Sequence, residues 1–120
     1  HNMKLMMPKN DSIARPYAIP YDYDYCGLVD ASYAVPAEAL GIESVRTRLY
    51  RGFPRGYDEL VQAIAVFNEK KERILYYIDH FELCSEKSRR SMHSYMNDFY
   101  ETINNKNKIE TVFIRNARNQ

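Results

Sequence analysis

The sequence predicts an α+β fold, in which a short N-terminal β-hairpin and irregular loops pack on a mainly helical C-terminal half. Three observations support this prediction. The chain has 120 residues, a length that suits one domain. Proline and glycine interrupt the sequence every few residues before Tyr57, and neither occurs after it. Beyond that point apolar residues recur at three- and four-residue spacing, which is typical of long amphipathic helices.

The hairpin is predicted from two short apolar stretches, residues 3–7 and 17–21, on either side of Pro8-Lys9-Asn10-Asp11-Ser12. The residues between the stretches are turn formers, so the simplest arrangement is a two-stranded antiparallel ribbon. Pro16 and Pro20 cannot donate ladder hydrogen bonds. We therefore expect the second strand to be short or to form an edge.

Two short helical turns are expected before the long helices. Residues 36–40 begin with proline, which is tolerated at a first helical position, and Gly41 follows as a stop signal. Ser44 is a good cap for a further short helix that would carry Val45 and Leu49 on one face.

A first long helix is expected from about Asp58, which would cap it, to about His80. Its apolar stripe contains Leu60, Ile64, Phe67, Ile74 and Ile78.

A second long helix, capped by Ser85 and ended by Asn104-Asn105, carries an apolar face of Met92, Met96, Phe99 and Ile103. The short connector 81–84 makes the two helices antiparallel neighbours. The tail fits a helix or a strand equally well. We thus divide the single domain into residues 1–56, 57–105 and 106–120.

The segment Tyr21-Asp22-Tyr23-Asp24-Tyr25-Cys26-Gly27 is the most informative for function. Two carboxylates after a strand form a candidate site for Mg²⁺ or Ca²⁺, provided that the chain turns so that both reach one ion. Gly27 makes such a turn plausible. An EF-hand is rejected, because its twelfth position is Tyr33 where a bidentate Glu is needed. Alternatively, Asp22 and Asp24 accept hydrogen bonds from neighbouring loop amides.

The opening His1-Asn2, the predicted hairpin, and Ile19-Pro20-Tyr21-Asp22-Tyr23-Asp24 followed by Gly27 carry a family resemblance. Together they resemble the C-terminal lobe of atypical kinases, most closely the CotH-type spore-coat protein kinases. The choline and aminoglycoside kinase group is a weaker likeness. Gly27-Leu28-Val29-Asp30 and the segment 44–52 also look like uncharacterised bacterial proteins that end in a helical pair.

The resemblance implies a metal and nucleotide site. Asn2 would be the catalytic-loop metal ligand and Asp22 the principal one, with Asp24 assisting. Mg²⁺ or Mn²⁺ with ATP would be the cofactor. The sequence has no glycine-rich phosphate loop and no preceding strand lysine, and the catalytic base would lie before His1. We therefore expect an inactive lobe, a piece of a longer protein whose partner is its own missing N-terminal portion.

An arginine cluster follows, with Arg46, Arg48, Arg51 and Arg55 and no acidic residue between the first and the last. The guanidinium fork suits phosphate or carboxylate, so Arg46, Arg48 and Arg51 are candidate anion-binding residues. The alternative, which we favour, is a solvated surface with the arginine stems packed on Tyr50 and Phe53.

A rival function of another class is a non-catalytic protein-interaction or structural module. Eleven tyrosines, many of them near the hairpin, would line a half-buried docking surface. The net charge of +1 gives no case for nucleic acid, and no apolar run approaches the roughly 18 residues that cross a bilayer. Cys26 and Cys84 fix neither a disulfide nor a compartment.

Overall fold

The computed structural model of the chain describes residues 2–10 and 15–118. The backbone forms two compact units, one up to Val45 and the other from Arg46 onward. Each unit is described by itself below. The sequence predicted a change of character near Tyr57, whereas the compact units divide at residue 45. A core shared by both halves stays a prediction.

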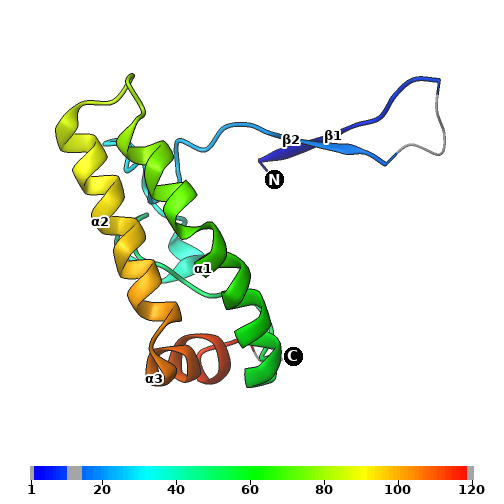
Figure 1. Ribbon diagram of the computed structural model, residues 1–120, viewed down its shortest axis with the longest axis vertical. Helices are drawn as coiled ribbons and strands as arrows, with labels where there is room; N and C mark the ends of the chain where they lie inside the picture. The colour runs from blue at the N-terminus through cyan, green and yellow to red at the C-terminus, as the bar shows by residue number, and fades with distance from the viewer. Residues whose placement is uncertain (1, 11–14, 119–120) are drawn as a thin grey trace. The chain divides into compact units, whose positions relative to one another are not determined.

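The first unit contains the hairpin that the sequence predicts (Figure 1). Strand β1, Met3–Met6, pairs antiparallel with strand β2, Tyr17–Pro20, in a register that sets Met3 opposite Pro20 and Leu5 opposite Ala18. Strand β2 has four residues and is short, as expected from Pro16 and Pro20. His1 and the turn residues Asp11 and Ser12, on which part of the prediction rested, lie outside the described residues.

The rest of this unit consists of loops with one short helix. The helical turn predicted within residues 36–40 is present as the 3₁₀-helix η1, Glu38–Leu40, which ends at Gly41 with a left-handed φ of 61°. Its predicted start at Pro36 is wrong, because Ala37 is the N-cap. The helix predicted after Ser44 is wrong, because residues 44–49 contain only a turn and bends. A helix over residues 44–49 would have few hydrogen bonds to offset the unfavourable free energy of forming its first turn. Arg46 and Arg48 already belong to the second unit, and their hydrogen bonds to Ser91 and Tyr95 of that unit stabilise a non-helical backbone there.

The second unit is a helical hairpin followed by a short helical tail. Helix α1, Tyr57–Asp79, and helix α2, Glu86–Ile103, run antiparallel and pack side by side (Figure 1). The tail forms helix α3, Lys106–Ile109, which continues into a π-helix, Glu110–Arg115. The open choice between helix and strand for the tail is thereby decided in favour of helix.

The helix ends follow capping chemistry. Ser85 is the N-cap of α2, as predicted, and its hydroxyl accepts a hydrogen bond from the Ser88 N–H at 3.1 Å. The cap predicted for α1 is displaced, because Gly56 and not Asp58 is the N-cap. The Glu59 carboxylate accepts a hydrogen bond from the Gly56 N–H at 3.1 Å, so the first turn is closed from inside the helix.

The core of the second unit is small. Among the described residues the buried apolar side chains are those of Ile78, Tyr100, Ile103, Ile109 and Ala117. Phe67, in the middle of the predicted stripe, is 47% exposed and contacts Phe99 edge-on at 5.3 Å between ring centroids. Within the described residues, none of the helices combines the length and the apolar character that a membrane crossing requires.

Candidate functional site

Asn2, just before β1, lies next to Asp22, which follows β2. The Tyr21 N–H donates a hydrogen bond to the Asn2 carbonyl at 3.0 Å, which continues the pairing of β1 with β2 by one residue. The side-chain amide of Asn2 then donates to the backbone carbonyl of Asp22. Residues 20 positions apart in the sequence thus meet at one end of the ribbon.

Strand β2 ends because the backbone turns at Asp22. This residue has a φ of 60°, a left-handed conformation that non-glycine residues rarely adopt and that aspartate tolerates better than most. In an extended strand the side chains of Asp22 and Asp24 would point to opposite faces. The turn was expected from Gly27, but the positive φ lies at Asp22 itself.

The turn places the two carboxyl groups near enough for each to shift the pKa of the other. A hydrogen bond between them, followed by the repulsion of the Asp24 charge, raises the pKa of Asp22 above its ordinary value. The same hydrogen bond, helped by one from Tyr33, lowers the pKa of Asp24. Of the two groups, Asp24 is therefore the one that ionises at the lower pH.

Tyr33 is a site residue that the sequence reasoning missed. Its hydroxyl donates a hydrogen bond to Asp24 Oδ2 at 2.9 Å, and this bond raises the pKa of the Tyr33 phenol. Its ring contacts that of Tyr25 edge-on at 6.2 Å. A signal existed in the sequence, because Tyr33 occupies the loop position at which a calcium loop would place an acidic ligand. Tyr25 and Tyr33 are 54% and 62% exposed, close to the half-buried tyrosine surface that the sequence predicts.

The donor set suits a hard divalent cation. Asp22, Asp24 and Asn2 provide carboxylate and amide oxygens, the ligands that Mg²⁺ takes, and two adjacent carboxylates favour a positive ion between them. In the part of the chain that the structure describes, no three His, Cys, Asp or Glu side chains gather closely enough to hold a metal by themselves. An ion here would therefore complete its coordination with water or phosphate oxygens, as Mg²⁺ commonly does.

Arg46 and Arg48 meet at a single aromatic ring on α2. The Arg48 guanidinium lies 3.5 Å from the Tyr95 ring centroid and that of Arg46 lies 4.6 Å from it. Arg46 donates hydrogen bonds to the Ser91 hydroxyl at 3.2 Å and to its carbonyl at 3.3 Å, and Arg48 donates to the Tyr95 carbonyl.

These contacts direct the two guanidinium groups onto their own unit. Burial lowers the pKa of Arg48 from its ordinary value. The stems were expected to pack on Tyr50 and Phe53, whereas the guanidinium groups stack on Tyr95. Arg51 is exposed and is not part of this stack. Anion binding by Arg46, Arg48 and Arg51 stays a prediction.

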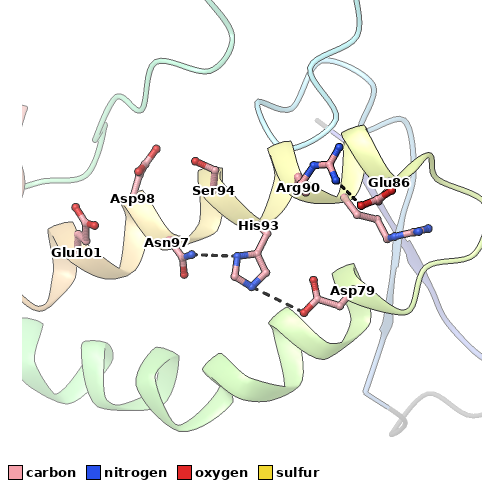
Figure 2. A pocket seen from close by; sticks show the side chains of 9 residues that line it. Asp79, Glu86, Arg90, His93, Ser94, Asn97, Asp98 and Glu101 are labelled. Carbon is pink, nitrogen blue, oxygen red and sulfur yellow. Dashed lines mark hydrogen bonds and ion pairs between the residues drawn. The ribbon is translucent and has the colours of Figure 1, made fainter.

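A polar cleft of about 650 Å³ runs along α2 (Figure 2). Its centre is His93, whose Nε2 lies 3.8 Å from Asp79 Oδ2 and whose Nδ1 lies 3.0 Å from the Asn97 amide nitrogen. The cleft is lined by both acidic and basic side chains, so its charge selects no single class of ligand. The contact between Asp79 and His93 in this cleft joins the end of α1 to the middle of α2.

Cys26 and Cys84, both within the described residues, are not joined by a disulfide in the structure. Comparisons with protein-family models, with curated proteins and with solved structures found no match. The evidence for function in this chain is therefore its own candidate site.

Proposed function

We propose that this chain is a kinase-like lobe and that it supplies the residues that bind the divalent cation of a nucleotide site. The observation that supports the proposal is the hydrogen bond from Asn2 to Asp22 at the end of the hairpin, where the backbone turns just before Asp24. The opposite pKa shifts of Asp22 and Asp24 agree with two interacting carboxyl groups there. Mg²⁺ or Mn²⁺ bound there would neutralise the two carboxylates and bridge them to the phosphates of ATP.

The roles of the three residues differ. Asp24 keeps its charge over the wider pH range and would attract the cation first. The Asp22 carboxylate would be the second ligand, and Asn2 would offer its amide oxygen. Phosphoryl transfer also needs a phosphate cradle and a positioned base. On its own, the chain is therefore expected to bind metal and nucleotide without transferring phosphate.

The test is a titration of the intact chain with Mg²⁺ or Mn²⁺, with and without ATP, while the melting temperature is measured. A ligand that binds only the folded state raises this temperature. Asp22→Asn and Asp24→Asn should abolish the rise. Asp30→Asn is the matched control, because Asp30 is an aspartate in the same unit with a similar left-handed φ of 53°.

The outcomes are distinct. A rise in melting temperature that persists in both site variants, or that Asp30→Asn removes equally, would contradict the proposed site. ATP hydrolysis or autophosphorylation by the wild type that Asp22→Ala abolishes would contradict the expectation of an inactive lobe.

A second candidate function is a non-catalytic interaction module. It is favoured by the apolar side chains that the first unit leaves exposed, including Met3, Leu5 and Tyr17 at 56%, 66% and 62%. Exposed apolar side chains concentrated on one ribbon are typical of binding surfaces. Under this function the melting temperature does not respond to Mg²⁺, and Asp22→Asn changes nothing.

A further inference from the structure

We propose that the free edge of β1 pairs with β1 of a second copy of this chain, so that two hairpins form one continuous sheet. The inference rests on the second candidate function, that of an interaction module, and specifies its surface and its partner.

The hairpin lacks the contacts that a stable ribbon needs. Every residue of β1 and of β2 is exposed, and within the described residues the sheet contains these two strands alone. An isolated two-stranded ribbon is at best marginally stable in water, and further strands or a covered face are needed to stabilise it. The ribbon is therefore suited to the addition of another strand.

The register determines which backbone groups face outward. In an antiparallel pair, hydrogen-bonded and non-hydrogen-bonded positions alternate. The bond from the Tyr21 N–H to the Asn2 carbonyl marks that pair as hydrogen-bonded. The next position, Met3 with Pro20, is therefore non-hydrogen-bonded, and so is Leu5 with Ala18. At both of these positions the C=O groups, and the N–H groups of every residue but Pro20, point away from the partner strand.

The two edges consequently differ in their capacity to accept a strand. On β2 the outward position at Pro20 has no N–H, and Pro16, directly before the strand, lacks one as well. On β1 the outward positions are Met3 and Leu5, and both have an N–H to donate. Proline thus blocks the edge of β2 and leaves that of β1 able to extend the sheet.

A second copy suits this edge because β1 is complementary to itself. In an antiparallel pairing centred on Leu5, each Lys4 lies across from Met6 of the other copy, so no like charges meet. Lys4 is the one charged residue of β1, and its ammonium lies 5.0 Å from the Tyr21 ring centroid, over its own sheet. A twofold interface of this kind closes after two copies.

The matched substitutions lie opposite each other in one non-hydrogen-bonded pair. Leu5→Pro removes an outward N–H from β1, and Ala18→Pro removes one from β2. Neither removes a hydrogen bond within the hairpin, and both introduce the same ring. Sedimentation velocity over a wide concentration range should show a dimer for the wild type and for Ala18→Pro. Leu5→Pro should weaken dimerisation about tenfold or more.

Amide hydrogen exchange tests the same point without any substitution. In the wild type, protection of the Leu5 amide should rise with protein concentration, while that of the Ala18 amide should not. Protection of the Lys4 and Ile19 amides, which face each other inside the hairpin, reports whether the Leu5→Pro ribbon remains folded.

Two results would overturn the inference. If the wild type is monomeric at every concentration, a second copy is not the partner. If it dimerises but Leu5→Pro dimerises equally well, or the Leu5 amide gains no protection, the edge of β1 is not the interface, although an interaction function stands.

Discussion

Asn68 on α1 and Asn104 at the end of α2 exchange two side-chain hydrogen bonds. The Asn68 amide donates to Asn104 Oδ1 at 2.8 Å, and the Asn104 amide donates to Asn68 Oδ1 at 3.0 Å. The Asn104 amide also donates to the Tyr100 carbonyl at 2.8 Å, which holds its plane in place. Each side chain uses both its donor and its acceptor, so the pair fixes the register of α1 against α2.

Asn68→Ala should lower the free energy of unfolding by about 1 kcal/mol, because one substitution removes both hydrogen bonds between the helices. Urea denaturation measures the change. Gln62→Ala, at an exposed position on the same helix, should change it little. If Asn68→Ala and Gln62→Ala have equal effects, the amide pair does not contribute to stability.

Tyr100→Phe should also cost about 1 kcal/mol, for a different reason. The Tyr100 side chain is 3% exposed, and its hydroxyl donates to the Phe67 carbonyl on α1 at 3.1 Å. The variant keeps the ring and loses this hydrogen bond. Tyr76→Phe, at a side chain that is 57% exposed, is the control and should be nearly neutral in the same urea experiment.

Tyr100 should also make the fold sensitive to alkaline pH. Burial, and secondarily the charge of Glu72, raise the pKa of Tyr100. Since the folded pKa exceeds the unfolded one, the contribution to stability is complete below the ordinary tyrosine pKa of about 10 and is lost as the pH rises through the folded value. Stability should fall more steeply above about pH 10 in the wild type than in Tyr100→Phe. Parallel curves would contradict this role.

The fold was predictable where local chemistry decides it. The Ser85 cap, the stop at Gly41 and the pairing of the two apolar stretches in the hairpin each depend on a few neighbouring residues, and the structure has them. The helix after Ser44 failed because Arg46 and Arg48 make contacts with α2 that no local pattern reveals. The prediction of Asp58 as the N-cap of α1 was wrong, because the helix begins at Tyr57 with Gly56 as its N-cap. The Glu59 carboxylate accepts a hydrogen bond from the Gly56 N–H and stabilises this earlier start.

The candidate site was predictable in composition but not in geometry. The spacing of Asp22 and Asp24 suggested a shared cation, but whether their carboxyl groups meet depends on the backbone angle at Asp22. Tyr33 lies nine residues beyond Asp24, and only the fold of the loop brings its hydroxyl to that carboxylate. A sequence pattern contains neither the angle nor the loop closure.

Ser85→Ala should destabilise the second unit by about 1 kcal/mol, because it removes the side-chain acceptor for the Ser88 N–H at the start of α2. Ser94→Ala, in the middle of the same helix, is the matched control. It should be neutral or slightly stabilising, since alanine is the better helix former. Thermal denaturation followed by circular dichroism compares the two. A Ser85→Ala variant as stable as Ser94→Ala would show that the cap is dispensable.

Gly52 is required by the ring of Tyr50, which folds back over it. A Cβ at Gly52 would lie 2.9 Å from Tyr50 Cε2 and closer still to the hydroxyl end of the ring. The ring has little freedom to move, because it contacts Phe113 edge-on at 5.0 Å and its hydroxyl donates to the Phe53 carbonyl at 3.2 Å. The Gly52 carbonyl is held as well, by the Arg118 N–H at 3.0 Å.

Gly52→Ala should therefore cost about 1–3 kcal/mol, the range for overpacking, measured as a shift of the urea midpoint. The cause can be isolated by a double-mutant cycle with Tyr50→Ala. Once the ring is removed, the added methyl group has room, and Gly52→Ala should cost little in that background. An equal loss in both backgrounds would mean that the glycine is needed for its backbone freedom and not for the space that it leaves to Tyr50.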